Sequence, residues 1–422
     1  MQINKKIPSK DAKDIKCGLL GEHLGHSFSP MIHRELAEYS YGLIEKSPDE
    51  IERFVRSDEL DAYNVTVPYK KAVMPFLDEI SPEALAIGAV NTVVRGADGK
   101  TRGYNTDYFG FCYMLDASKI EVSGKKALVI GAGGASATVC AVLRDREAGE
   151  VVVISRKDNT PEVLSTHADA EVIVNTTPVG MYPSNGSAPV DLSLFPACKG
   201  VLDVIYNPSK TSLLLDAEAR GIAHANGLSM LVAQAARACE LFTGKSIADG
   251  AYERIMRKIE EQTKNVILIG MPGCGKTTVG RIIANELGRP FFDTDDVFTE
   301  NFSSTPAEVI GRDGEEKFRQ MEHEIAEKLG RMSGAVISCG GGVVTREYNY
   351  PALHQNGVIV FIERDLDKLS KKGRPLSMAT PIEELYAARI DAYNRFCDVC
   401  VASTEVPKRT AALIIKHIFG EN

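Results

Sequence analysis

Short apolar runs alternate with helix-like stretches along most of this chain. The runs at 125–134, 151–156, 172–178 and 201–206 are typical of short buried strands, and each is followed by a turn. The stretch at 135–148, ASATVCAVLRDREA, has the composition of a helix. This alternation predicts parallel α/β architecture.

The strand–helix pattern begins again near residue 264. Residues 252–264, YERIMRKIEEQTK, predict a helix with a polar end, and they run directly into NVILIGMPGCGKTT, a strand that opens onto a glycine loop. Because the first strand of a new sheet needs its own core, we expect one domain over 1–262 and a second over 263–422.

Composition and charge exclude several classes of protein. The formal net charge of -8 argues against a protein that binds the nucleic-acid backbone, which requires a basic surface. No apolar run approaches the roughly 20 residues of a membrane helix, and the start, MQINKKIPSKDAKDIK, lacks the apolar core of a signal peptide. We therefore expect a cytoplasmic protein.

The nine cysteines agree with a reducing compartment, because their number is odd and their spacing shows no pairing. Cys397 and Cys400 form a single C-x-x-C. No second pair of ligands follows, so two packed thiols are favoured there over a redox or metal site.

The first glycine loop predicts a dinucleotide site. Gly131, Gly133 and Gly134 follow a strand and open a helix, where backbone N–H groups can approach a pyrophosphate as in a Rossmann fold. Arg156 and Lys157 end the next strand, where an arginine accommodates the 2′-phosphate of NADP. Asp158 leaves NAD open as well, and the two cations could also be ordinary solvated side chains.

Four polar motifs precede this loop. They are SFSP at 27–30 with His33, NVTVPYK at 64–70, GAVNT at 88–92, and GYNTD at 103–107. Hydroxyl and amide side chains suit a polyhydroxylated ligand, whose buried hydroxyls each need a partner. Any one motif could equally be turn chemistry. Together they supply one lysine and one aspartate, Lys70 and Asp107.

With these motifs, residues 15–262 resemble the shikimate dehydrogenase family. The match continues with NTTPVGM at 175–181, DVIY at 203–206 and GLSMLVAQA at 227–235. The resemblance implies an α/β substrate-binding subdomain over about 15–110, a Rossmann NADP subdomain over 111–240, and C-terminal helices that return to the first. It also implies NADPH-dependent reduction of 3-dehydroshikimate to shikimate.

The resemblance further implies a role for particular residues. Lys70 and Asp107 would be the catalytic pair, because a cation or acid must meet the ketone oxygen as it gains charge. The residues expected to hold the substrate are Ser27, Ser29, Thr66, Lys70, Asn91, Asp107, Tyr206 and Gln234. Those expected to hold the cofactor are Gly131, Ala132, Gly133, Gly134, Ala135, Ser155, Arg156, Lys157, Thr176, Gly227 and Met230.

The second glycine loop, GMPGCGKT at 270–277, fits the pattern of a P-loop. Its backbone N–H groups cradle phosphates, Lys276 reaches the β- and γ-phosphates, and the Thr277 hydroxyl binds Mg²⁺. The residues expected around the nucleotide are Gly273, Cys274, Gly275, Lys276, Thr277, Thr278 and Arg374. The motif therefore predicts an ATP-binding, parallel α/β domain like the nucleoside monophosphate kinases.

The motifs that follow resemble the shikimate kinase family over 264–422. They are FDTD at 292–295, GEEKFRQME at 314–322, SCGGGV at 338–343, GRPL at 373–376, and Arg389 on a late helix before Tyr393. The resemblance implies that Asp295, Arg319, Gly341 and Arg389 bind shikimate, and that Asp295 accepts or aligns the proton of the attacking hydroxyl. Asp293 would hold Mg²⁺ through water, beside Thr277, and Arg374 would close over the phosphates.

The sequence thus predicts one chain that reduces 3-dehydroshikimate with NADPH and then phosphorylates shikimate with ATP and Mg²⁺. Its partners would be small molecules, with neither nucleic acid nor membrane, as a monomer or a homodimer. One alternative is a quinate dehydrogenase joined to another hydroxyl kinase, although Ser29 is typical of relatives that prefer shikimate. Another is that one half keeps its fold only as a regulatory module.

Overall fold

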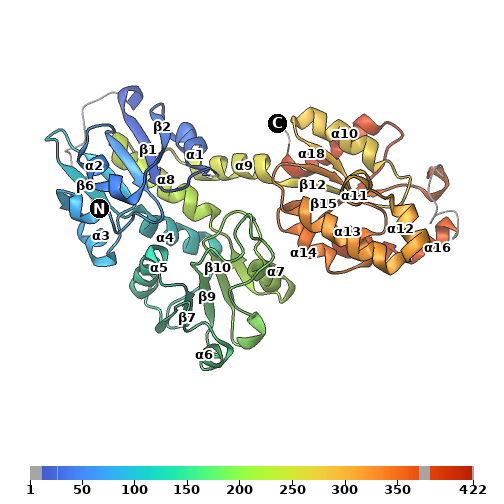
Figure 1. The fold of residues 1–422 in the computed structure, drawn as a ribbon, viewed down its shortest axis with the longest axis horizontal. Coiled ribbons are helices and arrows are strands. Elements are labelled where there is room, and N and C mark those ends of the chain that lie inside the picture. The colour runs from blue at the N-terminus through green and yellow to red at the C-terminus, as the bar shows by residue number, and fades with distance from the viewer. Residues whose placement is uncertain (1–11, 26, 370–380, 421–422) are drawn as a thin grey trace. The chain divides into compact units, whose positions relative to one another are not determined.

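The computed structural model describes residues 12–25, 27–369 and 381–420 (Figure 1). The chain folds into two compact units. The first holds Met1–Met181, Ser187–Tyr206 and Leu213–Arg257, and the second holds Tyr182–Gly186, Asn207–Ser212 and Lys258–Asn422. The main division lies within α9 (Ala251–Thr263), a few residues before the boundary expected from the sequence. The domain and subdomain limits themselves stay predictions.

The first sheet of the first unit is mixed rather than wholly parallel. Its six strands lie in the order β2-β1-β3-β5-β6-β4. Their bounds are β1 (Lys16–Gly21), β2 (Ser40–Glu45), β3 (Ala62–Val65), β4 (Glu79–Ile80), β5 (Thr92–Arg95) and β6 (Thr101–Tyr104). β1 is parallel to β2 and β3, whereas β5 is antiparallel to both β3 and β6. Only residues 96–100 separate β5 from β6, too few for the crossover that parallel strands need.

Two long helices connect this sheet with the rest of the unit. They are α4 (Thr106–Ser118) and α8 (Leu228–Thr243), and the shorter helices beside the sheet are α1 (Ser29–Leu36), α2 (Ile51–Arg56) and α3 (Pro82–Ile87). Cys239 and Phe242 of α8 pack in one core with Ile15 and Cys17. The chain therefore returns to the first sheet after it has built the second.

The second sheet is fully parallel and has the order β8-β7-β9-β10-β11. Its strands are β7 (Lys126–Ile130), β8 (Glu150–Ile154), β9 (Val172–Asn175), β10 (Gly200–Asp203) and β11 (Ala223–Ala225), and its helices are α5 (Gly134–Asp145), α6 (Pro161–Ser165) and α7 (Ser212–Ala219). The usual Rossmann order is 3-2-1-4-5-6. Between β8 and β9 the described chain forms only the short helix α6, so the third strand is missing and β8 is an edge.

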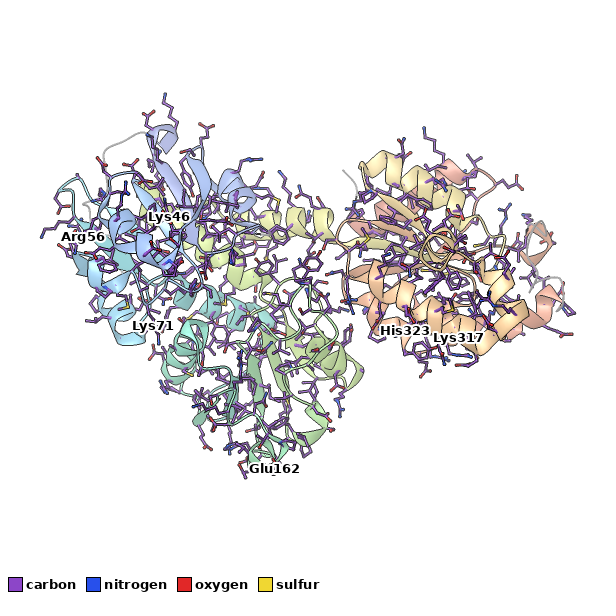
Figure 2. The ribbon with its side chains drawn as sticks, in the orientation of Figure 1. Lys46, Arg56, Lys71, Glu162, Lys317 and His323 are labelled. Atoms are coloured by element: carbon purple, nitrogen blue, oxygen red, sulfur yellow. The ribbon has the colours of Figure 1, made fainter. Side chains whose placement is uncertain are left out.

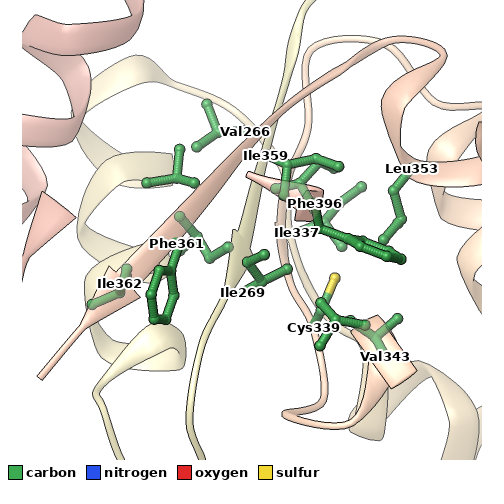
Figure 3. Close-up of a cluster of buried hydrophobic side chains, with 14 of the residues drawn as sticks. Val266, Ile269, Ile337, Cys339, Val343, Leu353, Ile359, Phe361, Ile362 and Phe396 are labelled. Atoms are coloured by element: carbon green, nitrogen blue, oxygen red, sulfur yellow. The ribbon is translucent and has the colours of Figure 1, made fainter. Parts of the chain in front are cut away.

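The second unit contains one parallel sheet of order β13-β14-β12-β15-β16. Its strands are β12 (Asn265–Ile269), β13 (Phe291–Asp293), β14 (Val336–Ser338), β15 (Gly357–Glu363) and β16 (Val399–Ala402). Its helices are α10 (Lys276–Leu287), α11 (Thr294–Phe302), α12 (Pro306–Asp313), α13 (Glu315–Gly330), α14 (Asn349–His354), α16 (Ile382–Ala387), α17 (Ile390–Phe396) and α18 (Pro407–Phe419). Figure 3 shows the apolar core between this sheet and its helices, where Ile269, Ile337 and Phe361 are fully buried.

Short 3₁₀ helices complete the described structure, at Ala12–Asp14, Pro48–Glu50, Met74–Phe76, Leu192–Leu194, Val343–Thr345 and Leu366–Lys368. None of the helices in the described ranges combines the length and the apolar character that a membrane crossing requires. The mixed α/β class with parallel sheets, predicted from the alternating pattern, is confirmed.

The separate cores predict that each unit can be destabilised without the other. Leu268 on β12 and Leu128 on β7 are both fully buried, in different cores. Leu268→Ala and Leu128→Ala should each cost about 2–5 kcal/mol of stability, because each leaves a cavity. In calorimetry of the full chain, each variant should lower a different one of two unfolding transitions. If either variant lowered both transitions equally, the two cores would form a single cooperative unit.

Candidate active sites

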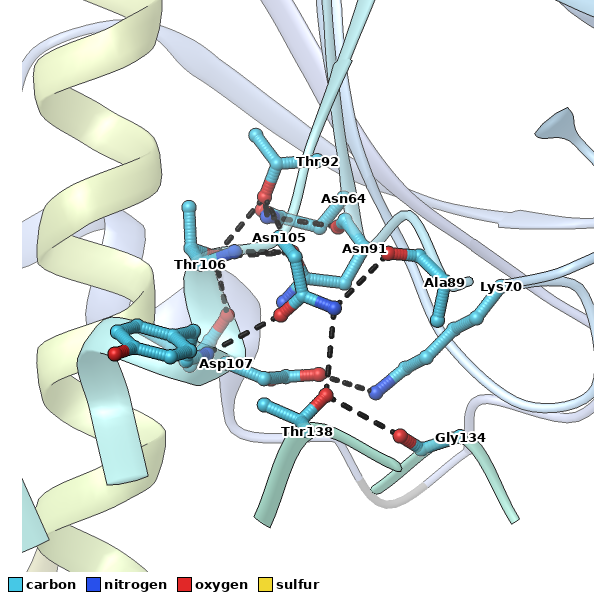
Figure 4. A network of polar contacts seen from close by, with 12 residues as sticks. Asn64, Lys70, Ala89, Asn91, Thr92, Asn105, Thr106, Asp107, Gly134 and Thr138 are labelled. Carbon is cyan, nitrogen blue, oxygen red and sulfur yellow. Dashed lines mark hydrogen bonds and ion pairs between the residues drawn. The ribbon is translucent and has the colours of Figure 1, made fainter. Parts of the chain in front are cut away.

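Lys70 and Asp107 form an ion pair in the first unit (Figure 4). Lys70 Nζ donates to Asp107 Oδ2 at 2.6 Å, and the two side chains are 18% and 11% exposed. Lys70 lies in the turn after β3, where its carbonyl accepts from the backbone N–H of Val90 at 2.8 Å. Asp107 lies in the first turn of α4, where the helix dipole favours a carboxylate. The two groups expected to carry the chemistry are therefore in direct contact.

Buried amides and hydroxyls surround this pair. Asn91 Oδ1 accepts from the backbone N–H of Thr106 at 2.6 Å, and Thr106 Oγ1 donates to Gln234 Oε1 at 3.5 Å. Asn64 Nδ2 donates to Thr92 Oγ1 at 3.0 Å, and Thr92 in turn donates to Asn91 Oδ1. The network links Asn91 and Gln234, both predicted to hold substrate, and it adds Asn64, Thr92 and Thr106, to which the sequence assigned no role.

The other predicted substrate residues come from three segments. Ser27 Oγ accepts from the backbone N–H of Ser29, and Ser29 is buried. Between these serines, Phe28 contacts the ring of Tyr206 with centroids 5.4 Å apart. Thr66 donates its backbone N–H to Leu20. Each of these residues has its own contacts within the first unit. Their role in substrate binding stays a prediction.

The first glycine turn lies beside the ion pair. Gly131 has a φ of 112°, and a Cβ there would lie 2.6 Å from Thr176 Oγ1, so the turn requires glycine. A Cβ on Gly134 would lie 3.7 Å from Lys70 Cδ. Ala132 and Gly133 are exposed, which leaves backbone N–H groups accessible at the start of α5. These features fit a bound pyrophosphate next to Lys70.

Gly227 and Met230, which were also expected to hold the cofactor, pack closely against neighbouring segments. A Cβ on Gly227 would lie 2.0 Å from the carbonyl oxygen of Val204, so only glycine fits there. Met230 is buried on α8, and its carbonyl closely faces Gly110 of α4. Both positions therefore fix α8 against its neighbours, whatever contact they make with a cofactor.

The end of β8 presents two exposed cations. Arg156 and Lys157 are exposed, whereas the hydroxyl of Ser155 donates to the carboxylate of Asp158 within the same turn. The acidic group that could bind a ribose 2′-hydroxyl is thus engaged locally, and the basic groups remain available for a 2′-phosphate.

The P-loop of the second unit has the backbone of a phosphate cradle. Gly270, Gly273 and Gly275 have φ values of 144°, 87° and 105°, a region that favours glycine. Lys276 begins α10, and its Nζ donates to the carbonyls of Gly270 at 2.9 Å and Met271 at 3.1 Å. Cys274 is fully buried within the loop and Thr278 is exposed on α10.

The two predicted magnesium ligands are in contact. Thr277 Oγ1 donates to Asp293 Oδ2 at 2.8 Å. A hydroxyl beside a carboxylate matches the oxygen ligands of Mg²⁺, which usually keeps several waters and takes few protein ligands. The described residues thus fit this ion, although they hold no cluster of three or more His, Cys, Asp or Glu side chains.

A cavity of about 440 Å³ gathers the predicted kinase residues. The predicted residues among its lining are Lys276, Thr277, Asp293, Asp295, Arg319, Gly341 and Arg389. Arg389 Nη1 and the Tyr393 hydroxyl both donate to the carbonyl of Gly341, at 3.2 Å and 2.5 Å. Arg389 lies in the turn before α17 rather than on the helix, which corrects the sequence-based placement. Arg374 lies outside the described residues.

Arg319 is enclosed by carboxylates. Its side chain is 1% exposed, and its guanidinium donates to Glu322 at 2.6 Å and to Glu315 at 2.9 Å. Burial would lower the pKa of Arg319, but Glu322 and Glu315 raise it above its usual value. Burial raises the pKa of Glu322, and Arg319 opposes that shift. The sequence showed the i, i+3 spacing of Arg319 and Glu322 but assigned Glu315 and Glu322 no role in the site.

The remaining motif is the C-x-x-C. Cys397 is half-buried and Cys400 is exposed, so the expectation of two packed thiols is wrong for Cys400, which lies on the edge strand β16. All nine cysteines are free thiols in the structure.

The folds and sites define two classes of enzyme in one chain: a Rossmann oxidoreductase unit and a P-loop phosphotransferase unit. Family models agree. The shikimate dehydrogenase substrate-binding domain matches residues 19–93, the shikimate 5′-dehydrogenase C-terminal domain matches 227–249, and shikimate kinase matches 272–419. These domains indicate both an oxidoreductase and a kinase activity, with NADP and ATP as cofactors.

Relatives identify the first unit. A shikimate dehydrogenase (NADP(+)) of Clostridium perfringens strain SM101 is 39% identical over 264 residues, which cover 56% of this chain and 97% of the relative. The crystal structure of a chorismate mutase/shikimate 5-dehydrogenase fusion from Clostridium acetobutylicum is 36% identical, with a TM-score of 0.54 over 58% of this chain and 97% of that one. A shikimate 5-dehydrogenase from Thermus thermophilus, in complex with NADP(H) and shikimate, is 33% identical, with a TM-score of 0.52 over 58% of this chain and 99% of that one. The chain belongs to the shikimate dehydrogenase family and carries a shikimate kinase domain as well.

The position of Glu315 predicts competition for Arg319. The resemblance implies that Arg319 binds shikimate, and Glu315 already occupies its guanidinium. If the substrate carboxylate competes with Glu315 for this group, Glu315→Gln should lower the KM for shikimate in the kinase reaction. Glu315 is 52% exposed, so solvent screens its side of the pair. The change should therefore be roughly 1.5- to 5-fold, which corresponds to the about 0.2–1 kcal/mol of a solvent-screened ion pair. Steady-state kinetics with varied shikimate provide the measurement.

Glu316→Gln is the matched control, since the exposed Glu316 pairs with Arg346 instead. A higher KM in Glu315→Gln than in this control would mean that Glu315 helps to hold Arg319 for the substrate.

Proposed function

We propose that this chain catalyses two consecutive reactions, the NADPH-dependent reduction of 3-dehydroshikimate to shikimate and the ATP-dependent phosphorylation of shikimate at the 3-hydroxyl. The observation that carries the first step is the contact between Lys70 and Asp107 beside the Gly134 turn. The observation that carries the second is the cavity that joins the P-loop to Asp295 and Arg319.

In the reduction, NADPH held at the Gly131–Gly134 turn would supply the hydride that the ketone carbon accepts. Lys70 then meets the oxygen on which negative charge develops and provides it with a proton. Asp107 holds Lys70 in position through the 2.6 Å ion pair and accepts a hydrogen bond from a neighbouring substrate hydroxyl. Ser27, Ser29, Thr66, Asn91, Tyr206 and Gln234 would bind the carboxylate and the remaining hydroxyls.

The choice of NADP over NAD would rest on Arg156 and Lys157. Both are exposed at the end of β8, and Ser155 engages the one acidic side chain of that turn. In a Rossmann fold the adenosine ribose is expected at this strand end, and β8 is an edge strand of the described sheet.

In the phosphorylation, Arg319 and Arg389 would clamp the substrate carboxylate with guanidinium forks. Asp295 would take the proton from the attacking 3-hydroxyl. Lys276 would neutralise charge on the transferred phosphoryl group. Thr277 with Asp293 would hold Mg²⁺, which would offset negative charge on the phosphates. Arg374, outside the described residues, is proposed to close over those phosphates.

The order of the two steps follows from their chemistry. The reduction creates the hydroxyl that the kinase phosphorylates, so the product of one site is the substrate of the other. We propose small molecules as the partners, and a cytoplasmic location where free thiols persist. The shared chain is not by itself a reason to expect direct transfer between the sites.

The main competing function is quinate oxidation at the first site. Ser29 is buried beside Ser27 and favours shikimate by family resemblance. Purified protein assayed with shikimate and with quinate, under NADP⁺ and then NAD⁺, would decide. Faster turnover of quinate with NAD⁺ would overturn the proposed substrate and cofactor together.

Lys70→Ala tests the first site. Removal of the cation that meets the developing oxyanion should lower NADPH oxidation by at least about 100-fold, the lower range for a general acid. Phosphorylation of added shikimate should stay near wild type. The control is Lys71→Ala, because the neighbouring Lys71 is exposed (Figure 2). Loss of both activities in a folded Lys70→Ala protein would contradict the assignment of the two sites.

Lys276→Ala tests the second site in the opposite sense. Phosphorylation should fall by two orders of magnitude or more, on the order of the loss seen when one transition-state donor is removed, while NADPH oxidation stays unchanged. Lys317→Ala on the exposed side of α13 is the control (Figure 2). Phosphoryl transfer at the wild-type rate in Lys276→Ala would refute the P-loop assignment.

A further inference from the structure

Asn105 lies at the junction of three parts of the first unit. It is the residue between β6 and α4, and it is 4% exposed. Its Oδ1 accepts from the backbone N–H of Tyr108 at 3.1 Å, which caps the N-terminus of α4. The helix that it caps carries Asp107 in its first turn.

The amide nitrogen of Asn105 makes two further bonds. It donates to the carbonyl of Ala89 at 2.9 Å and to Thr138 Oγ1 at 3.3 Å (Figure 4). Ala89 belongs to the segment that carries Asn91, and Thr138 lies on α5 with 0% of its surface exposed. One side chain therefore connects the substrate-side segment, the helix of Asp107 and the helix that follows the dinucleotide turn.

Thr138 extends the connection to the turn itself. Its Oγ1 donates to the carbonyl of Gly134, the first residue of α5, at 3.2 Å. Both N–H groups of the Asn105 amide and the O–H of Thr138 thus each have an acceptor. A buried, fully satisfied network of this kind fixes one geometry, because each member left unpaired is costly.

Both ends of this hydrogen-bond network lie close to the Lys70–Asp107 ion pair. Asp107 is two residues from Asn105, and a Cβ on Gly134 would lie 3.7 Å from Lys70 Cδ. Val90, next to Ala89, donates its backbone N–H to the carbonyl of Lys70. The separation between the dinucleotide turn and the Lys70–Asp107 pair is therefore set by bonds that pass through Asn105 and Thr138.

We propose that Asn105 and Thr138 are positioning residues, which set the dinucleotide turn against the Lys70–Asp107 pair for hydride transfer. This inference rests on the proposed reductase function. Neither side chain needs to touch the substrate or cofactor. Their bond determines the alignment of donor and acceptor, and misplacement by about 1 Å can cost up to 100-fold in rate.

The test uses the full chain and two variants that remove the bond from opposite ends. Thr138→Val removes the hydroxyl at nearly constant volume. Asn105→Ser keeps a good N-cap for α4 but is too short to reach Thr138. We expect each variant to lower kcat for NADPH-dependent reduction by roughly 10- to 100-fold, because the alignment changes. The KM for 3-dehydroshikimate should stay within about twofold of wild type, because substrate binding is unchanged.

Three further readouts separate positioning from general damage. Because hydride transfer would become slower relative to the other steps, the isotope effect with 4-deuterated NADPH should increase. Thr138→Ser should restore kcat, since it keeps the hydroxyl. The double variant Asn105→Ser/Thr138→Val should be no slower than the slower single variant, because both substitutions remove the same bond.

Thr243→Val is the matched control. The hydroxyl of Thr243 on α8 donates to the carbonyl four residues earlier, as that of Thr138 does, but it makes no bond to Asn105. This variant should keep the wild-type isotope effect. Phosphorylation of shikimate by the same protein samples should stay constant, which shows that the second unit is folded. The unfolding transition of the first unit should remain present in calorimetry, which shows that the first unit is folded as well.

The inference is overturned if Thr138→Val and Asn105→Ser both keep kcat within twofold of wild type. It is also overturned if Thr138→Ser is as slow as Thr138→Val, or if the effects of the two single substitutions multiply in the double variant. Failure of the proposed function would look different, because the wild-type chain itself would then not oxidise NADPH with 3-dehydroshikimate.

Discussion

Both sites depend on the same physical constraint: a parallel strand must turn sharply into a helix while its backbone stays open to an anion. At Gly131 and Gly270 the chain meets this constraint with φ values of 112° and 144° and with neighbours that exclude a Cβ. The helix that follows each turn presents unpaired N–H groups and its positive dipole end. The charged residues of each site, Lys70 with Asp107 and Lys276 with Asp293, then need only lie near these turns.

The sequence predicted the features that local chemistry determines. Glycine spacing located both turns, apolar runs located the strands at 126–130 and 265–269, and lysine within each motif located the cations. Residues 157–171 show no strand pattern, in agreement with the absence of a strand between β8 and β9 in the described chain. The order of the strands in the second sheet was not predicted, because it depends on how the helices pack. The antiparallel pairing of β5 and β6 was also missed. The alternation of strand-like and helix-like stretches had been taken to predict parallel strands along the whole chain.

Polar contacts between residues far apart in the chain could not be predicted from the sequence either. Asn105 stood inside a quoted motif, but its partner Thr138 is 33 residues away on a helix that showed only an apolar pattern. Glu315 and Glu322 were visible on the helix of Arg319, yet only the structure shows that both occupy its guanidinium. In each case the sequence showed the polar residues but not their partners, because the partners depend on how separate segments pack. That packing also explains why the two sites combine rigid turns with satisfied buried networks.

The most direct test of the whole account is one reaction mixture that contains the purified chain, 3-dehydroshikimate, NADPH, ATP and Mg²⁺. If the two sites act in sequence, NADPH oxidised and ADP released should approach a ratio of one to one, and ADP should not form when NADPH is left out. Release of ADP without NADPH, or oxidation of NADPH with no ADP at completion, would contradict the claim that the second site consumes the product of the first.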